Sequence, residues 1–346
     1  MDISSQDFRA KCLEATVDLL WRQWCSLGVS GRAAPVNQSL LLDPEALLLV
    51  TTAIGRSEPR LFDEMLDWLN SFGGLLSLQR LKNLQHSMQI GDERVTSAIS
   101  AWMVTQKKHP RWKTMVCAKK HGGHPEALFF GHPPSERSTL DASFLTFGLQ
   151  RPSIDLRGHS RPANPASASN LMLTLRALIG VSSRVEVILF LGTRSPAYAA
   201  EIARATGYAP RTLQALLSEM TLSGRVLSQE DEEGHGKKIQ RGANRTYRMA
   251  SEDWAFLAGG SAMARWTPWA AFFRLVCQVL EAIPAPGEPQ KHSAVISSKI
   301  RDAMRIYGPR LTNYSFFDAL ALRLDAPGEE IIQKIGAAIL NLIARM

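Results

Sequence analysis

Hallmarks of exported and membrane-spanning chains are missing from this sequence. Its first twenty residues mix acids and bases without a basic start followed by an apolar run, so we expect a cytoplasmic protein. The best candidate for a membrane span, 269–280, is short and is interrupted by Arg274 and Gln278, so no span is predicted. The four cysteines stand far apart without a CxxC pair, at Cys12, Cys25, Cys117 and Cys277. This spacing predicts reduced thiols with structural roles.

Signatures of common enzyme classes are missing too. The chain has no nucleophile elbow, Walker loop, HExxH motif or dinucleotide fingerprint, and the Gly-Gly pairs at 122–123 and 259–260 lack the flanking strand and helix that phosphate binding requires. Asp63, Glu64 and Asp67 share one predicted helix, where we interpret them as a solvated face rather than an acid-base pair. We predict that the protein is not an enzyme and needs no cofactor, although a site assembled from distant residues would leave no motif.

The charge balance favours a polyanionic partner. The 346 residues include 40 Lys and Arg against 32 Asp and Glu, which gives a net charge of +8. Such an excess suits nonspecific association with nucleic acid but says nothing about the fold. The length exceeds a single typical domain of about 100–200 residues, so we expect two or three domains.

Residues 1–106 are predicted to form a helical N-terminal domain. Asp43, Pro44 and Glu45 provide an N-cap, a first-turn proline and an acidic first turn just before an apolar run. After Pro59, apolar residues recur at helical spacing until a Gly-Gly pair. Two more helices are expected near 77–88 and 92–106. The pattern fits an all-helical domain or a degenerate winged helix, and both interpretations stay open.

Helical periodicity fails from 107 to 170, where seven prolines punctuate a polar stretch. We predict a connector between domains. Its beginning is basic and has no acid before Glu126, with Lys107, Lys108, Arg111, Lys113, Lys119 and Lys120. We interpret it as a solvated linker, and a nonspecific phosphate-contacting arm is the alternative.

Cys117, His121, His124 and His132 cluster in this connector, close to His109. Thiolate and imidazole are suitable zinc ligands. The spacing Cys-x3-His-x2-His-x7-His nevertheless matches no zinc pattern. We therefore predict solvated histidines and no metal, with a zinc site as the alternative.

The segment 171–258 contains the most informative pattern. An apolar helix at 171–179 leads into a second one at 183–191. The next helix, 198–206, has alanines that permit close packing, and Gly207 after it can adopt positive φ in a tight turn. Pro210 then begins a helix at 210–223 whose Leu and Met residues fall on one face. A strand after Gly224, a loop and a returning strand at 245–249 complete the pattern.

Taken together, EIARATGYAPRTLQALLSEMTLSGRVL followed by NRTYRM resembles the winged helix-turn-helix regulators of the MarR-like and ArsR-like kind in bacteria and archaea. The resemblance covers residues 182–249. It implies a mainly α protein with a small β wing, in which a central winged helix-turn-helix is flanked by helical domains.

The resemblance also implies a DNA interface. The helix 210–223 would be the recognition helix, and its residues nearest the bases would be Arg211, Thr212, Gln214 and Ser218. The wing 226–249 would reach the DNA backbone through Lys237, Lys238, Arg241 and Arg245. Ala209 departs from the pattern, because it stands where a capping Ser or Thr is favoured. The acids at 230–233 would repel phosphate, so the basic half of the wing must make the contact.

Residues 259–346 are predicted to form a helical C-terminal domain. Amphipathic helices are expected at 268–283 and 327–345, the second with a stripe of Ile331, Ile335, Ile339 and Ile343. Such a stripe packs within the chain or forms a dimer interface. This half is also aromatic, with Trp254, Trp266, Trp269, Phe272, Phe273, Tyr307, Tyr314, Phe316 and Phe317. Core packing explains these rings, and a small-molecule sensor pocket is the alternative.

These observations favour a DNA-binding transcriptional regulator. We expect double-stranded DNA as its partner and a homodimer that places two recognition helices in successive major grooves. The alternative is an adaptor in a multi-protein system, which would use the same winged helix to hold a protein partner without sequence-specific DNA binding.

Overall fold

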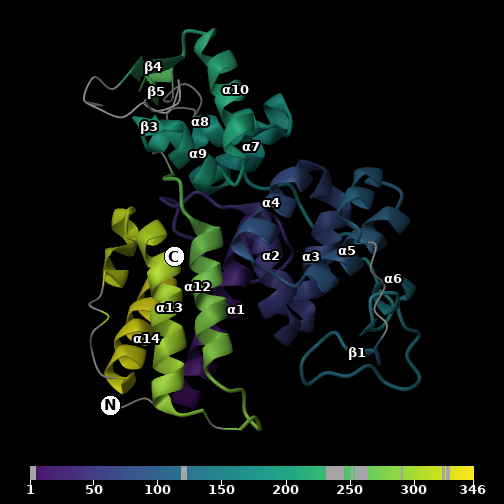
Figure 1. The fold of residues 1–346 in the computed structure, drawn as a ribbon. Helices are drawn as coiled ribbons and strands as arrows, with labels where there is room; N and C mark the ends of the chain where they lie inside the picture. The colour runs from purple at the N-terminus through teal and green to yellow at the C-terminus, as the bar shows by residue number, and fades with distance from the viewer. Residues whose placement is uncertain are drawn as a thin grey trace.

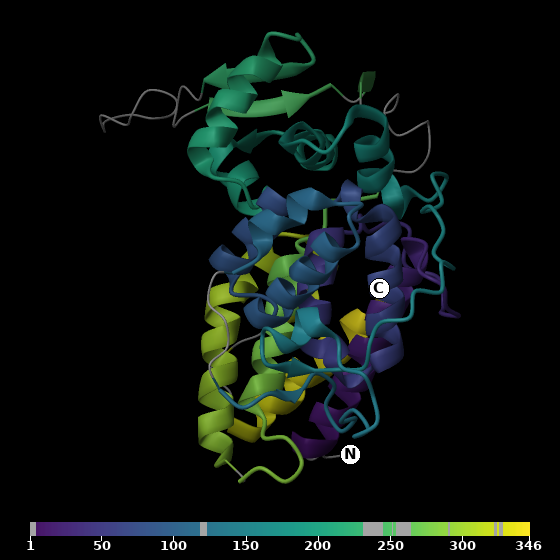
Figure 2. The ribbon, with the colours of Figure 1, turned by 90° about the vertical axis from the view of Figure 1, so that its right-hand side faces the viewer.

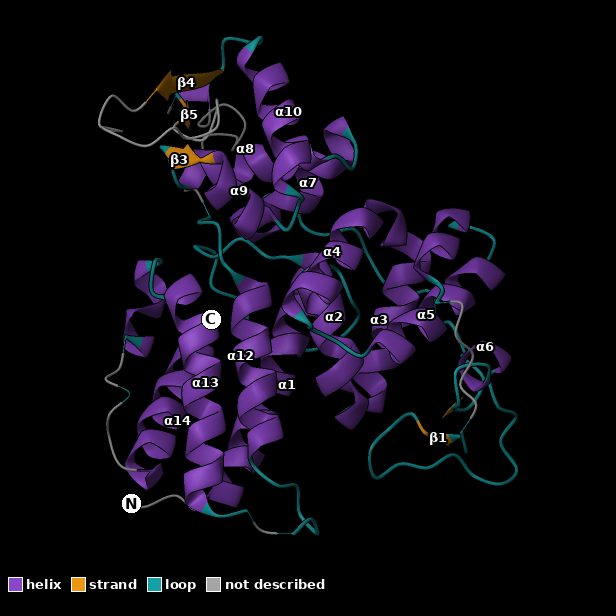
Figure 3. Cartoon of the chain, viewed as in Figure 1, coloured by secondary structure: helices purple, strands orange, loops and turns teal. Residues whose placement is uncertain are grey.

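The structure, a computed structural model, describes residues 5–117, 123–230, 245–250, 252–253, 264–289, 291–321, 324 and 328–346. Within these residues helices dominate and the strands are short and few (Figure 3), which confirms the predicted mainly α class. No helix in the described parts of the chain is long and apolar enough to cross a membrane.

The N-terminal part folds into helices close to their predicted positions. They are α1 (Ser5–Ser26), α2 (Pro44–Ala53), η1 (Ile54–Ser57), α3 (Pro59–Phe72), η2 (Gly73–Leu75), α4 (Leu78–Met88) and α5 (Glu93–Thr105). Asp43 caps α2 as predicted, because its carboxylate accepts a hydrogen bond from the amide of Ala46 at 3.0 Å. The start of α3 at Pro59 and its end before the Gly-Gly pair are likewise confirmed.

Residues 107–170 pack onto the N-terminal helices more closely than predicted. Their short elements are η3 (Pro110–Met115), β1 (Glu126–Ala127), α6 (Ala142–Leu145), β2 (Leu149–Gln150) and η4 (Ala168–Asn170). Trp112, Phe144 and Leu149 are fully buried in the same core as α3 and α5. The prediction of a solvated linker is wrong for these residues, because irregularly spaced apolar side chains give no helical or strand period to detect.

The basic start of this segment is partly engaged in internal contacts. A guanidinium nitrogen of Arg111 donates to the carbonyl oxygen of Leu76 at 2.9 Å and also to that of Gly74. Lys119 and Lys120 lie outside the described residues.

The described residues within 171–249 form the unit at the top of Figure 1. Its elements are α7 (Leu171–Ile179), α8 (Ser183–Thr193), β3 (Ala197–Tyr198), α9 (Ala199–Thr206), α10 (Pro210–Thr221), β4 (Val226–Glu230) and β5 (Arg245–Met249). The strands form an antiparallel sheet of order β3-β5-β4, in which Tyr247 lies opposite Ala197 on one side and Ser228 on the other. Gly207 has φ of +81° in the turn between α9 and α10, as predicted.

The C-terminal part contributes α12 (Trp269–Ala282), α13 (Ser293–Leu311), η5 (Ser315–Leu320) and α14 (Gly328–Arg345). Of these elements, α12 and α14 contact α1, which is distant in sequence, and α13 packs against α12 and α14 (Figure 1 and Figure 2). The isoleucine stripe of α14, from Ile331 to Ile343, is buried in this packing. The stripe therefore packs within the chain, and the alternative interpretation, in which it forms a dimer interface, is wrong.

The apolar residues separate into two cores. One joins α1–α5 and the buried part of 107–149 to α12–α14, so the predicted N-terminal and C-terminal helical domains share it. The other lies within 171–249 and also includes Leu41 and Trp266. Hydrogen bonds of Leu41 connect the two cores. Its amide donates to the carbonyl of Arg265 at 2.9 Å, and its carbonyl accepts from the Trp269 indole at 2.7 Å.

Candidate functional site

One face of α10 is exposed and the other is buried. Leu213, Leu216 and Leu217 are buried in the core of the 171–249 unit. The side chains predicted to contact bases all occupy exposed positions, namely Arg211, Thr212, Gln214 and Ser218. Among the described residues none of these four forms an ion pair, and the Ser218 hydroxyl donates to the carbonyl of Gln214 at 2.9 Å. This face of α10 therefore presents polar groups to the surroundings of the chain.

The N-terminal end of α10 lies beside α4. Ala209 provides no side-chain cap there, so the amides of Arg211 and Thr212 have no partner within the helix. A cleft of about 790 Å³ opens between this end and α4, and Lys82 and His86 line it. Free amides at a helix N-terminus together with a lysine across the cleft make this end electropositive.

The hairpin places one predicted phosphate-contacting residue within the described chain. Arg245 on β5 forms an ion pair with Glu230 on β4 at 2.6 Å, and both side chains are exposed. The positive charge of Arg245 is therefore already shared with an acid. The other three predicted wing contacts, Lys237, Lys238 and Arg241, lie outside the described residues.

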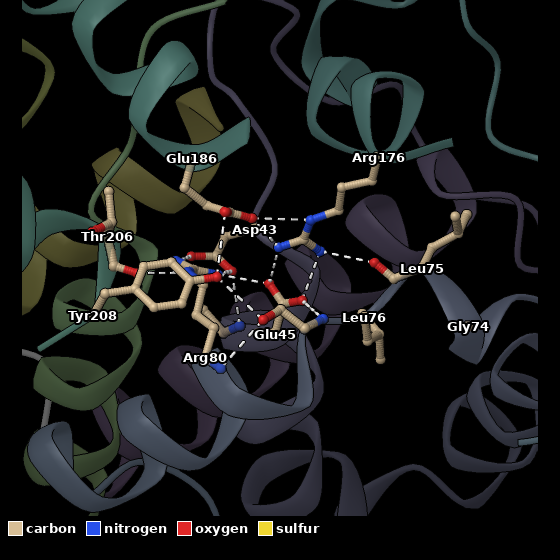
Figure 4. Close-up of polar contacts among 12 residues, drawn as sticks. Asp43, Glu45, Gly74, Leu75, Leu76, Arg80, Arg176, Glu186, Thr206 and Tyr208 are labelled. Carbon is tan, nitrogen blue, oxygen red and sulfur yellow. Dashed lines mark hydrogen bonds and ion pairs between the residues drawn. The ribbon is translucent and has the colours of Figure 1, made fainter. Parts of the chain in front are cut away.

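A buried cluster of charged side chains joins the 171–249 unit to the N-terminal helices (Figure 4). We call this cluster the ionic joint. It consists of two arginines and three carboxylates, namely Arg80, Arg176, Asp43, Glu45 and Glu186. None of the five residues is more than 4% exposed. They come from α4, α7, the start of α2 and α8, so the joint ties together elements of both cores.

Arg80 connects the start of α2 to the end of α9. Its guanidinium donates to both carboxylate oxygens of Asp43, at 2.6 and 2.5 Å, and to Glu45 at 2.7 Å. Its Nε donates to the carbonyl of Thr206 at 2.7 Å. Because Thr206 immediately precedes the turn into α10, Arg80 fixes the position of that turn relative to α2 and α4.

Arg176 uses all five of its N–H groups inside the joint. Its terminal nitrogens donate to both oxygens of Glu45, at 2.6 and 3.0 Å, and to the carbonyl of Leu75 at 3.0 Å. Its Nε and one terminal nitrogen donate to Glu186 at 3.0 and 2.5 Å. A guanidinium with every donor satisfied is the arrangement that makes burial of this charge tolerable.

Tyr208, two residues beyond Thr206, brings the turn itself into the joint. Its hydroxyl donates to Glu186 at 3.3 Å and lies 3.2 Å from the hydroxyl of Ser77. Burial, and then the negative charge of Glu186, raise the pKa of Tyr208 well above its usual value. Tyr208 is therefore a neutral phenol that can donate to the carboxylate.

Asp43 is ionised in this setting. Burial alone would raise its pKa, but the charge and hydrogen bonds of Arg80 outweigh that effect and hold the pKa of Asp43 below its usual value. In the joint, three carboxyl groups face two guanidinium groups.

The sequence does not reveal the joint. Asp43 and Glu45 are recognised only as helix-start residues, and Arg176 and Glu186 occupy positions of no particular pattern. The one signal that could have found them is the presence of charged residues inside strongly apolar helices, such as Glu186 between Val185 and Val187. Charges at such positions require buried partners.

The three acids of α3 lie in different surroundings. The prediction that they form a solvated face is wrong for Glu64 and Asp67, which are buried. Asp67 accepts hydrogen bonds from the amide and hydroxyl of Ser160, at 3.1 and 2.8 Å, and so anchors the chain before α7. Asp63, in contrast, is half-exposed and pairs with Arg151 at 2.8 Å.

The cysteines and histidines form no metal site that can be identified. In the portions of the chain that the structure describes, no group of three or more His, Cys, Asp or Glu residues is arranged to hold a metal ion. His121 of the Cys/His cluster lies outside those portions. All four cysteines are free thiols, and burial raises the pKa of both Cys12 and Cys277 to about 12.

The aromatic residues of the C-terminal part mainly build the core, as predicted. Trp269 stacks on Phe273 with a centroid distance of 5.3 Å, and Phe272 contacts Phe317 at 5.6 Å. Trp254 lies outside the described residues. Comparisons of the whole chain with protein-family models, with curated proteins and with solved structures found no match.

Proposed function

We propose that this chain is a DNA-binding transcriptional regulator in which residues 182–249 act as a winged helix-turn-helix. The order of elements supports this: helix α8, strand β3, helix α9, a tight turn, helix α10 and the hairpin β4–β5. The observation that carries the proposal is the exposed polar face of α10, where Arg211, Gln214 and Ser218 form no ion pair with any residue that the structure describes.

These side chains suit a helix that enters a major groove. Arg211, Gln214 and Ser218 follow one another at i, i+3 and i+7, so they form one line along the helix. Arg pairs with guanine and Gln with adenine through two hydrogen bonds each, and each such pair supplies about 1–3 kcal/mol of discrimination. The amides at the start of α10 suit a backbone phosphate.

The neighbouring helix α4 extends this surface. Lys82 lies across the cleft from the start of α10 and has no carboxylate partner among the described residues. A phosphate that approaches the N-terminal end of α10 would meet this lysine. Lys82 would add affinity without sequence preference.

A salt titration of duplex binding, followed by fluorescence anisotropy, tests the proposal. Neutralised phosphates make log affinity fall linearly with log salt concentration, so a steep negative slope is expected. Alanine at Arg211 or Gln214 should reduce the preference for the best-bound sequence, whereas Lys82→Ala should weaken all sequences alike and flatten the slope by about 1. No binding at low salt, or equal effects from both kinds of variant, would contradict the assignment.

A homodimer is part of this proposal. Two copies related by a two-fold axis would place their α10 helices about 34 Å apart, one turn of DNA. The stripe on α14 is buried and cannot provide the interface. Light scattering of the purified protein, alone and with a palindromic duplex, measures whether two chains bind per site.

One observation favours the adaptor alternative. The end of α7 leaves Leu178 and Ile179 exposed at 75% and 52%, and adjacent exposed apolar residues are typical of protein contacts. If duplex binding fails at low salt, capture of a protein partner through this end of α7 becomes the better explanation. The double variant Leu178→Ser/Ile179→Ser would then abolish the capture.

A further inference from the structure

A second cleft lies where α9 approaches the C-terminal helices. It has a volume of about 400 Å³ and is bounded by α9, α4, the start of α12 and the end of α13. The volume falls within the range of about 300–1,000 Å³ that is usual for small-molecule sites. Five arginines line it: Arg80, Arg194, Arg204, Arg305 and Arg310.

The two acids in the cleft are already occupied. Asp43 binds Arg80 in the ionic joint, at 2.5 Å. Glu201 binds Arg194 at 3.2 Å, and the Arg194 guanidinium also stacks over the ring of Tyr314 at 4.5 Å. These four side chains therefore contribute no free charge to the cleft, and the remaining arginines determine its potential.

Those remaining arginines lack adequate partners. Arg204 on α9 forms no ion pair or hydrogen bond with any residue that the structure describes. Arg310 on α13 donates to the thioether sulfur of Met88, a weak acceptor. Arg305 approaches Asp302 only at 3.6 Å, and both of these side chains are largely exposed. Arg204 and Arg310 thus line one small cavity without an ion-pair partner among the described residues.

Apolar side chains form another part of the cleft wall, beside the polar Thr267 and Asn313. Leu84 and Met88 from α4 and Pro309 from α13 line it, and Ile306 on α13 remains 53% exposed at the cleft. A simple inorganic ion would leave these surfaces without contact. The wall therefore suits a ligand that has an apolar body as well as negative charge.

We propose that this cleft binds a small organic anion with two negative charges and an apolar body, such as an organic phosphate. The anionic group would bind between Arg204 and Arg310, and the apolar body would lie against Ile306 and Met88. Guanidinium groups suit this chemistry, because their planar N–H pairs match the oxygens of phosphate and carboxylate.

The ligand would connect two parts of the molecule. Arg204 belongs to α9 in the 171–249 unit, whereas Arg305 and Arg310 belong to α13 and the other core. An anion bound to both sets of residues would hold α9 against α13. This assignment does not require DNA binding, although Arg204 and Arg310 also line the cleft beside the start of α10.

Calorimetric titration of the full chain with phenyl phosphate tests the assignment. Inorganic phosphate is the probe for the anionic group of the ligand, and phenol is the probe for its apolar body. We expect one saturable site for phenyl phosphate, and binding of inorganic phosphate and of phenol that is at least tenfold weaker. Each of Arg204→Ala and Arg310→Ala should weaken phenyl phosphate binding about tenfold, the loss expected for one hydrogen bond to a charged group.

The matched control is Arg137→Ala. Arg137 is exposed and lies outside the cleft, so its removal changes the net charge equally and should leave the affinity within about twofold. Thermal unfolding of each variant verifies that it is folded. Absence of saturable binding at about 10 mM phenyl phosphate, or equal losses in Arg137→Ala and Arg204→Ala, would overturn the assignment. If duplex DNA competes with phenyl phosphate, and if Arg204→Ala abolishes this competition, the cleft is instead a contact for the DNA backbone.

Discussion

Replacement of Arg176 by methionine is the sharpest test of the ionic joint. Methionine fills similar space but removes the guanidinium, and it leaves Glu45 and Glu186 facing each other without a cation between them. Both carboxylates are fully buried, so water cannot replace the lost hydrogen bonds. Removing one partner of a buried ion pair destabilises proteins by about 3–5 kcal/mol. Against a total stability of about 5–15 kcal/mol, this is a large loss.

The matched control is Arg184→Met on the neighbouring helix. Arg184 pairs with Glu219 at 2.5 Å, but both side chains are about half exposed. A pair of this kind contributes about 0–1 kcal/mol. Arg176→Met should therefore lower the free energy of unfolding several times more than Arg184→Met does.

Urea unfolding followed by tryptophan fluorescence measures both variants. Because the chain has two cores that need not unfold together, hydrogen exchange of amides in α7–α10 should accompany it and report the joint locally. The double variant Arg176→Met/Glu186→Leu removes one of the stranded carboxylates and should recover part of the loss. Equal destabilisation by Arg176→Met and Arg184→Met would refute the view that the joint holds the two units together.

Three further predictions concern the same region and the cores. Arg80 keeps the pKa of Asp43 below the value of about 3.9 that an aspartate has in the unfolded chain, so the ionised carboxylate stabilises the fold above a pH of about 3.9. This stabilisation should disappear as the pH falls through the lower pKa of the folded state. Asp43→Asn should remove this part of the pH dependence of urea unfolding. Gly207→Ala should destabilise by about 1–2 kcal/mol in thermal unfolding, because φ is +81° and the new Cβ would lie 2.8 Å from Leu84, and an unchanged melting temperature would contradict this. Ile339→Ala should cost about 2–5 kcal/mol if the α14 stripe is core, and a change in oligomeric state without loss of stability would contradict the burial.

Much of the secondary structure could be predicted because its signals are local. Asp43 with Pro44 marks a helix start, and Gly207 marks a turn, whatever surrounds them. The role of 107–149 could not be predicted, because Trp112 and Phe144 reach the core through tertiary packing without any period. The exposed face of α10 followed from periodicity, whereas the clefts beside it depend on how α4 and α13 approach from distant parts of the chain.

The ionic joint and the arginine cleft are physically continuous, and this has a thermodynamic consequence. Arg80 lines the cleft and also holds the carbonyl of Thr206 beside the turn into α10. An anion in the cleft would compete with Asp43 for the charge of Arg80 and pull on Arg204 at the same time. If that displaces α10, phenyl phosphate must change the dissociation constant for duplex DNA by some factor, and duplex must change the constant for phenyl phosphate by the same factor. A factor that differs from one would establish coupling between the two ligands, and a factor of one would leave two independent sites on a rigid joint.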